Sequence, residues 1–165
     1  MSKISIALLV SGVCGAAWAG KPKVAVLGLE VVASKGKPDA ATLAAAHDLT
    51  DALRARAKAG TGPWELAPGS DKDLADLKRK NKCANEATAC MAVIGNDLGA
   101  ETLLFGKLEK TATDYRLTVR LLDVRTKSAR AALTDTLPTS ATATDVQAFG
   151  KKVFAKLADT TAPKP

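Results

Sequence analysis

The chain has 165 residues, of which 24 are lysine or arginine and 17 are aspartate or glutamate, so its formal net charge is +7. Apolar residues make up 47% and charged residues 25%, an ordinary globular balance that excludes collagen-like and low-complexity chains. Three cysteines are too few for a disulfide-packed miniprotein, and a single histidine disfavours a histidine-based metal site. We therefore expect one globular domain with no metal and no cofactor.

The first nineteen residues have the pattern of a cleavable secretory signal peptide. Lys3 is followed by an uncharged stretch from Ile4 to Ala17, and Ala17-Trp18-Ala19 supplies small residues at the −3 and −1 positions of a cleavage site. A membrane anchor is the alternative, but about 14 helical residues span only about 21 Å of a hydrocarbon core that is about 30 Å thick. Cleavage after Ala19 predicts a periplasmic protein with no transmembrane segment in the rest of the chain.

The first element of the remaining chain is a nearly continuous apolar run, Lys23–Val32, which predicts a strand buried on both faces. After a loop, Asp39 is placed to cap a helix that ends at Gly60. The residues expected on the inward face of this helix recur every three or four positions: Leu43, Ala46, Leu49, Leu53 and Ala57.

Trp64–Ala67 predicts a short strand, and Ser70 with Asp73 resembles a capping box that opens a short helix. Asn85 is expected to cap the next helix, which ends at Gly99. The inward residues expected in these two helices are Leu74 and Leu77, then Ala87, Met91, Ile94 and Leu98.

Cys83 and Cys90 remain after removal of the signal peptide, and an even pair in an exported chain is expected to be oxidised. On one continuous helix their Cα atoms would lie about 10.5 Å apart, beyond the reach of a disulfide. The chain must therefore turn between them, which the segment Ala84–Glu86 permits. The spacing matches neither a C-x-x-C redox pair nor a zinc site, so we predict a structural disulfide.

The next predicted elements are three strands: Glu101–Glu109, Asp114–Thr126 and a third that ends near Pro138. The second strand alternates apolar with polar residues until the adjacent Leu121 and Leu122, where we expect a β-bulge. Thr144 with Gln147 is expected to form the capping box of a final helix. The inward residues of this helix are expected to be Val146, Phe149, Val153 and Leu157.

The resulting order of elements is β-α-β-α-α-β-β-β-α. It predicts an α/β (α+β) sandwich with a mixed five-stranded sheet. Residues 20–158 are expected to form a single domain, and residues 159–165 a flexible C-terminal tail.

No residue pattern indicates catalysis. His47 lies one position off the apolar stripe of its helix, and the neighbouring Asp48 does not face it, so a surface histidine is expected. Asp71, Asp73 and Asp76 suit the start of a helix, where acidic side chains favour the helix dipole. We predict that the chain is not an enzyme, with a small wall hydrolase that uses such carboxylates as the alternative.

Basic side chains are the best candidates for a binding surface. Arg116 and Arg120 project from one face of the predicted strand, and Arg125, Lys127 and Arg130 are expected to extend this candidate basic surface. A secondary basic cluster ends the preceding short helix: Lys78, Arg79, Lys80 and Lys82. Such surfaces bind anionic glycan, lipid headgroups or an acidic protein, although solvated surface charge is the plainer interpretation. Nucleic acid is not an expected partner, because the chain is exported and no aromatic residues alternate with the basic ones.

Several segments resemble the small α/β domain at the N-terminus of the Tol-system protein TolB. The strongest matches are LGAETLLFGKL at Leu98–Leu108 and YRLTVRLLDV at Tyr115–Val124. Weaker matches are the strand Val24–Val26 and the helix Leu49–Leu53, which leads to Trp64–Leu66. Related domains occur in the curli secretion lipoprotein, a flagellar accessory lipoprotein and a lipoprotein activator of penicillin-binding proteins.

The resemblance covers about residues 21–157 and implies a non-catalytic docking or assembly module. Its expected partners are inner- or outer-membrane components of a Gram-negative envelope machine for assembly, secretion, motility or envelope integrity. No β-propeller, clear lipobox or pore-forming hairpin is recognised in the sequence, so lipoprotein binding and channel formation are not implied. The alternative function is direct binding of anionic glycan or peptidoglycan, which would regulate a cell-wall enzyme.

The intact mass of the exported protein tests the predicted processing. Signal cleavage after Ala19 leaves an unmodified chain that begins at Gly20, and this is the mass we expect. Lipoprotein processing would instead retain Cys14 with a diacylglycerol group, although Val13 stands where that processing requires a small residue. A lipidated mass would contradict the prediction of a freely diffusing periplasmic protein.

Overall fold

The computed structural model describes residues 20–33 and 36–161. The predicted signal peptide at residues 1–19, with Cys14 inside it, lies outside the described residues. In chain order, the elements are β1 (Lys23–Val26), β2 (Glu30–Val32), α1 (Ala40–Lys58), β3 (Glu65–Leu66), α2 (Leu74–Lys80), α3 (Thr88–Asp97), β4 (Thr102–Lys110), β5 (Asp114–Asp123), β6 (Ser128–Pro138) and α4 (Ala143–Thr161).

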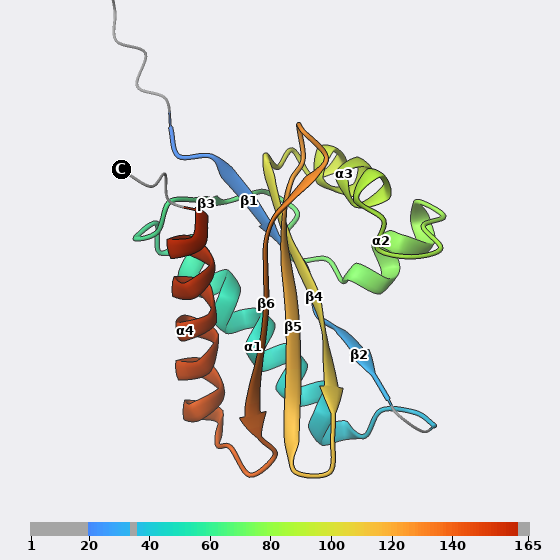
Figure 1. Ribbon diagram of the computed structural model, residues 1–165, viewed down its shortest axis with the longest axis vertical. Coiled ribbons are helices and arrows are strands. Elements are labelled where there is room, and N and C mark those ends of the chain that lie inside the picture. The colour runs from blue at the N-terminus through green and yellow to red at the C-terminus, as the bar shows by residue number, and fades with distance from the viewer. Residues whose placement is uncertain (1–19, 34–35, 162–165) are drawn as a thin grey trace, which may run out of the picture.

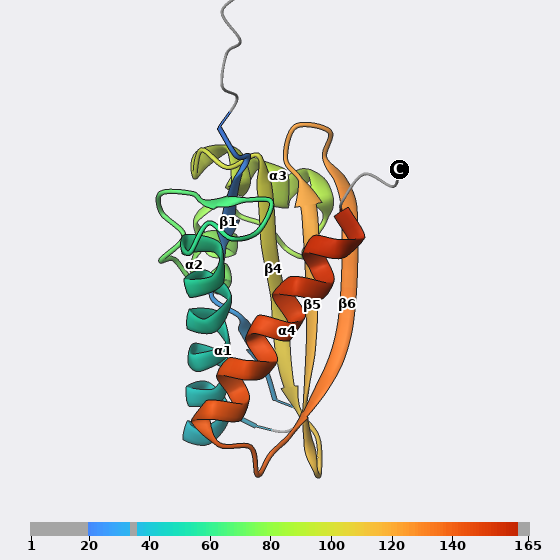
Figure 2. The same ribbon diagram turned by 90° about the vertical axis from the view of Figure 1, so that its left-hand side faces the viewer.

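The strands form one mixed sheet in the order β3-β1-β4-β5-β6, and β2 pairs with β4 beyond the end of β1. The pairs β1–β3, β1–β4 and β2–β4 are parallel, whereas β4–β5 and β5–β6 are antiparallel. Helices α1 and α4 lie over one face of the sheet (Figure 2), and α2 and α3 lie over the upper part of the other face (Figure 1). The predicted α/β class with a mixed sheet is confirmed.

The sheet has six strands rather than the predicted five, because the apolar run Lys23–Val32 is interrupted. Val26 pairs with Leu104, and Glu30 pairs with Lys107. The chain therefore advances four residues from β1 to β2 while β4 advances three. One extra residue on one strand is a β-bulge.

This bulge changes which residues face α1. Val26 before the bulge and both Leu29 and Val31 after it pack into the same apolar cluster beneath α1. In a regular strand, alternation from Val26 would turn Gly28 and Glu30 toward this cluster instead. The bulge therefore keeps the Glu30 carboxylate out of the core, where an unpaired charge would be strongly destabilising.

Gly28 also brings the start of α2 to the sheet. Its N–H donates to the Lys72 carbonyl oxygen at 3.0 Å, and its own carbonyl accepts from the Leu74 N–H at 3.2 Å. A Cβ atom at position 28 would overlap the Asp73 side chain, so any larger residue would push the start of α2 away.

Two apolar clusters lie on the two sides of the sheet. The cluster beneath α1 and α4 contains most of the residues predicted to face inward: Ala46, Leu49, Leu53, Ala57, Val146, Phe149, Val153 and Leu157. The cluster beneath α2 and α3 contains the others: Leu74, Leu77, Met91, Ile94 and Leu98. Two inward predictions are wrong, since Ala87 is exposed just before α3 and Leu43 is 51% exposed. Leu43 lies in the first turns of α1. These turns run along the edge of β2, whereas the rest of the helix packs against the sheet.

Helix α1 begins where the sequence predicts. Asp39 Oδ1 accepts hydrogen bonds from the Thr42 N–H at 2.7 Å and the Thr42 hydroxyl at 2.8 Å, and its Oδ2 accepts from Lys110 Nζ at 2.8 Å. The bond from Lys110, followed by those from Thr42, lowers the pKa of Asp39 to about 2. The helix ends at Lys58, and Gly60 follows with a φ of +64°.

Two predicted N-caps have other roles. The buried Ser70 hydroxyl donates to the Ala67 carbonyl at 2.8 Å and accepts a backbone N–H of β1 at 3.3 Å, so it fastens a loop to the sheet. Helix α2 instead begins after Asp73. Asn85 Oδ1 accepts from the Ala87 N–H at 3.0 Å and shapes the turn, while α3 begins after Ala87.

The capping box of α4 is formed by Thr142 and Asp145, not by the predicted Thr144 and Gln147. The Thr142 N–H and hydroxyl donate to Asp145 Oδ2 at 2.9 and 2.7 Å, and the Asp145 N–H donates back at 3.3 Å. Helix α4 continues to Thr161, so residues 159–161 of the predicted tail are helical, and residues 162–165 lie outside the described part.

The low pKa of Asp39 predicts an acid-dependent contribution to stability. A carboxyl group whose pKa is lowered by folding stabilises the folded state at pH values above its ordinary pKa, which is 3.8 for Asp39. This contribution to stability is lost as the pH falls toward about 2. Asp39→Asn keeps a capping oxygen but removes the charge. We expect the wild-type melting temperature to exceed that of Asp39→Asn at pH 7, and the difference to vanish near pH 2.

Thermal unfolding followed by circular dichroism across this pH range measures the difference. The exposed Asp71→Asn is the matched control. A difference between wild type and Asp39→Asn that stays constant with pH would contradict the prediction.

Candidate binding surface

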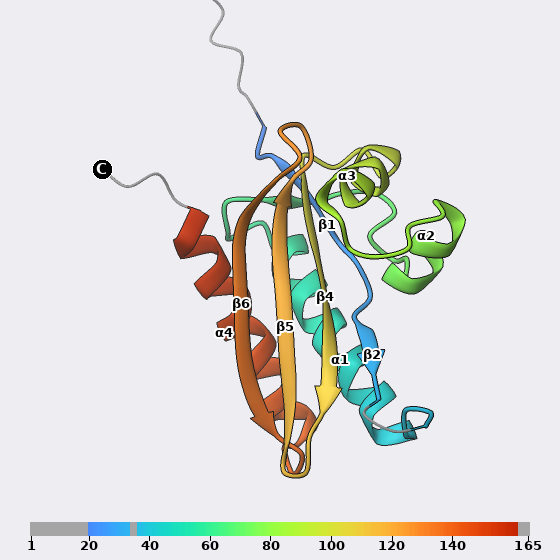
Figure 3. The ribbon, with the colours of Figure 1, turned by 45° about the vertical axis from the view of Figure 1, so that its right-hand side comes forward.

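In the part of the chain that the structure describes, no helix covers the lower half of one sheet face. Helices α2 and α3 pack over its upper half, against Leu103, Phe105 and Leu122, and leave the lower half free (Figure 3). We call this free area the open face, and its exposed or half-exposed side chains include Lys107, Glu109, Arg116, Thr118, Arg120, Ala132, Thr134 and Thr136.

Alternation along β5 produces the open face. Arg116 and Arg120 are exposed, whereas Val119 between them is fully buried on the other side. A register shift between Leu121 and Leu122 confirms the predicted bulge. Beyond this bulge, Leu122 packs against α3 and the open face ends.

Pairing with β4 adds two charged side chains to the open face. Lys107 lies opposite Thr118, and Glu109 lies opposite Arg116, with 3.9 Å between Glu109 Oε2 and Arg116 Nη1. Sequence reasoning missed Lys107, although the residue alternates with buried neighbours on both sides. The antiparallel register that places Lys107 beside the arginines could not be read from the sequence.

Carboxylates from other elements approach the remaining cations. Arg120 Nη1 lies 3.7 Å from Glu86 Oε2, and Lys78 Nζ donates to Glu30 Oε2 at 2.8 Å. A shallow depression of about 530 Å³ beside the α2–α3 connection is lined by Lys78, Glu86, Lys107 and Arg120. Of the cations at the open face and in this depression, Lys107 alone has no carboxylate partner within 4 Å among the described residues. The surface is therefore of mixed charge rather than a basic stripe.

The other members of the candidate basic surface do not join the open face. Arg125 and Lys127 lie in the β5–β6 turn at the upper end of the sheet (Figure 3). Arg130 donates to Asp123 Oδ2 at 2.6 Å, and the Thr126 N–H donates to Asp123 Oδ1 at 2.8 Å. The Thr126 N–H, aided by Arg130, holds the pKa of Asp123 below its ordinary value, so Arg130 stabilises this turn.

The secondary basic cluster is also divided. Lys78 reaches the depression beside the open face, whereas Arg79 pairs with the exposed Asp76 one turn earlier on α2. Lys80 and Lys82 are exposed, and Lys82 has a positive φ of 55° just beyond the helix. The cluster therefore contributes one side chain to the candidate surface.

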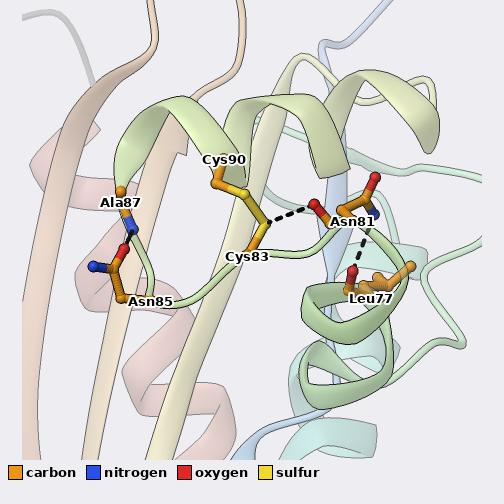
Figure 4. The surroundings of a disulfide bond; sticks show 6 residues. All are labelled: Leu77, Asn81, Cys83, Asn85, Ala87 and Cys90. Carbon is orange, nitrogen blue, oxygen red and sulfur yellow. Dashed lines mark hydrogen bonds between the residues drawn. A yellow bond between two sulfur atoms is a disulfide. The ribbon is translucent and has the colours of Figure 1, made fainter.

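The structure contains the predicted disulfide between Cys83 and Cys90, with a Cα–Cα distance of 5.9 Å (Figure 4). It closes the connection between α2 and α3, within which Asn85 accepts a hydrogen bond from a backbone N–H two residues on. Glu86 belongs to this closed loop. The disulfide thereby holds Glu86 beside Arg120 at the edge of the open face.

The candidate catalytic groups lie at the surface. His47 is exposed, with its Nδ1 3.5 Å from Asp51 and 3.8 Å from Asp48, and Asp71 and Asp73 are exposed as well. Across residues 20–33 and 36–161, no group of three histidine, cysteine or acidic side chains is arranged to hold a metal ion. No helix within the same ranges combines the length and apolar character needed to cross a membrane.

No protein-family model matches the chain, and no curated protein matches it by sequence. Among solved structures, the chain is similar to TolB from Acinetobacter baumannii, at 15% identity and a TM-score of 0.49, over 87% of this chain and 29% of TolB. It is also similar to the LpoB C-terminal domain from Escherichia coli, at 16% identity and a TM-score of 0.48, over 71% of this chain and 82% of the LpoB chain. A third similar structure is the lipoprotein GNA1162 from Neisseria meningitidis, at 12% identity and a TM-score of 0.49, over 84% of this chain and 97% of GNA1162.

TolB is the protein to which the sequence resemblance points. The likeness is one of mixed α/β architecture.

Removal of the disulfide tests its structural role. The double variant Cys83→Ser/Cys90→Ser is expected to lower the free energy of unfolding by about 2–3 kcal/mol, because the closed loop is short. Denaturant unfolding measures this difference, and a reductant should lower the stability of the wild type to that of the variant. The double variant itself is the control, since its stability should not respond to reductant. A wild type whose stability is unchanged after complete reduction would contradict the prediction.

Proposed function

We propose that this chain is a non-catalytic accessory module of the Gram-negative periplasm that docks onto a protein component of an envelope machine through the open face. The predicted signal peptide and the Cys83–Cys90 pair support an oxidising, exported location. The sequence resemblance to TolB-type domains supports an accessory role.

The observation that carries this proposal is the uncovered half of the sheet with its charges of both signs. Arg116, Arg120 and Lys78 each have a carboxylate within 4 Å. A polyanion brought to this face would meet those carboxylates as well as the cations. A protein surface with its own alternating charges fits the face better, because electrostatic complementarity rewards matched pairs and penalises like charges.

The alternative, direct binding of anionic glycan or peptidoglycan, rests on the net charge of +7 and on Lys107, which has no carboxylate partner among the described residues. Binding of that kind depends on long-range attraction, which weakens steeply as salt screens it. The two functions therefore differ in salt dependence and in the nature of the bound molecule.

A photo-crosslinking residue at Thr118, in the centre of the open face, tests the proposal in living cells. We expect discrete protein adducts that mass spectrometry identifies, and a loss of about tenfold or more in adduct yield when Arg116→Glu and Arg120→Glu are combined. The matched control places the same crosslinker at Ala148, which is exposed on α4.

Two results would count against the open face as a protein-docking surface. The first is a set of adducts from Ala148 equal to those from Thr118. The second is salt-sensitive sedimentation with purified peptidoglycan that the two arginine substitutions abolish, which would establish the glycan alternative instead.

A further inference from the structure

A second surface, separate from the open face, has the form of a groove along β2. The groove measures about 440 Å³ and lies between β2, the first turns of α1 and the start of α2. Its apolar lining includes Leu29, Val31, Leu43 and Ala46. We call it the β2 groove.

One wall of the β2 groove is an unpaired strand edge. Among the described residues, β2 pairs with β4 alone, and β3 extends the sheet beside β1 but not beside β2 (Figure 1). An unpaired strand edge presents backbone N–H and C=O groups that another extended chain can pair with. The three residues of β2 are half-buried, so this edge is accessible from the side.

Leu43 lies on the opposite wall of the β2 groove. It is 51% exposed, and the described residues contain one other large apolar side chain of similar exposure, Val93 at 48% on α3. An apolar side chain beside a free strand edge is the arrangement found where extended peptides dock by strand addition. In such sites the backbone supplies hydrogen bonds and adjacent pockets select alternate side chains.

The charges that line the β2 groove favour a basic occupant. Three carboxylates, from Glu30, Asp73 and Asp76, line it together with one guanidinium, from Arg54, and the imidazole of His47. The Arg54 guanidinium already has partners within the chain: its Nε and Nη2 donate to two backbone carbonyls at 3.1 and 3.2 Å, and its Nη1 lies 3.8 Å from Asp51 Oδ1. Lys78 neutralises Glu30 and Arg79 pairs with Asp76, while the side-chain carboxylate of Asp73 has no hydrogen-bonding or ion-pair partner among the described residues. The chain as a whole is basic, so this acidic lining is a local feature.

We propose that the β2 groove binds an extended segment of a partner protein in which apolar residues alternate with basic ones. The segment adds a strand to the free edge of β2 and places an apolar side chain against Leu43 and Val31. Its basic side chain lies near Asp73, at the end of the groove where α2 begins. This proposal does not depend on the open face. Arg116 and Arg120 belong to the open face and not to the groove, whereas Leu43 belongs to the groove and not to the open face.

The test uses a fluorescein-labelled peptide that alternates valine with lysine, and a matched peptide with glutamate in place of lysine. With the wild-type chain, fluorescence polarisation is expected to show about tenfold tighter binding of the lysine peptide. Nuclear magnetic resonance should place the largest amide shifts at residues 30–32 and near position 43. Leu43→Asp is expected to weaken binding of the lysine peptide by about tenfold or more, and Asp73→Asn to reduce the preference for lysine over glutamate.

Val93→Asp is the matched control, because it introduces the same charge at an equally exposed apolar position outside the groove. It should leave the affinity within about twofold of wild type. The combined Arg116→Glu and Arg120→Glu variant should do the same, which separates this proposal from the function proposed for the open face. Circular dichroism of each variant confirms that it is folded.

Three outcomes would overturn the proposal. One is equal binding by Leu43→Asp and Val93→Asp, and another is amide shifts concentrated on β6 at the opposite edge of the sheet. The third is a concentration-dependent dimer in sedimentation velocity that Leu43→Asp dissociates, which would make a second copy of this chain the occupant.

Discussion

The one-residue bulge between Val26 and Glu30 determines how both faces of the sheet are used. It lets Leu29 and Val31 join the core beneath α1 while Glu30 reaches Lys78 on the other face. It also frees the backbone of Gly28 to bond with the chain that starts α2, so the same irregularity anchors the second layer of helices. Among the described residues, the outer edge of β2 stays unpaired because the two-residue β3 extends the sheet beside β1 and stops short of β2.

Helix length explains why one half-face stays open. At about 1.5 Å per residue, the 19 residues of α1 and of α4 each span about 28 Å, which is most of the length of the long strands β4, β5 and β6. The 7 residues of α2 and the 10 of α3 span only about 10 and 15 Å. The second layer of helices therefore covers the upper sheet and ends where β5 changes from buried Leu122 to exposed Arg120. The disulfide fixes this border, because it closes the loop whose Glu86 meets Arg120.

The sequence predicted the features that depend on periodicity or on local capping. The inward stripe of α4, the alternation of β5, the start of α1 at Asp39 and the turn between the cysteines all follow from the spacing of residues near in sequence. The β1–β2 bulge was missed because KVAVLGLEVV is apolar on both faces, so no alternation marks the reversal. Ser70 was misplaced because its hydroxyl bonds to β1, 44 residues away in sequence, rather than to the next helix.

The same distinction applies to the candidate surface. Alternation placed Arg116 and Arg120 on one face, but it could not show that Glu109 and Glu86 come from a neighbouring strand and a loop to meet them. Charge partners of this kind depend on strand register and on helix packing, which are long-range properties. For the same reason Arg130 was assigned to a binding surface although it serves Asp123 within its own turn.

The net charge of +7 combines a general positive potential with local charge patterns, and the positions of the charged residues distinguish the two. Exposed cations without a role in the open face, such as Lys80, Lys82, Arg125 and Lys127, spread positive potential over the upper part of the molecule. That potential acts at long range, favours the approach of a partner with net negative charge and weakens with salt, so it does not assist the approach of the basic segment proposed for the β2 groove. The open face and the β2 groove instead carry local charge patterns, paired in the first and acidic in the second, and the docking proposed for each depends on contact rather than on long-range attraction. For the docking that we propose, substitutions of these dispersed cations should change the association rate, and substitutions within the two surfaces should change the lifetime of the complex.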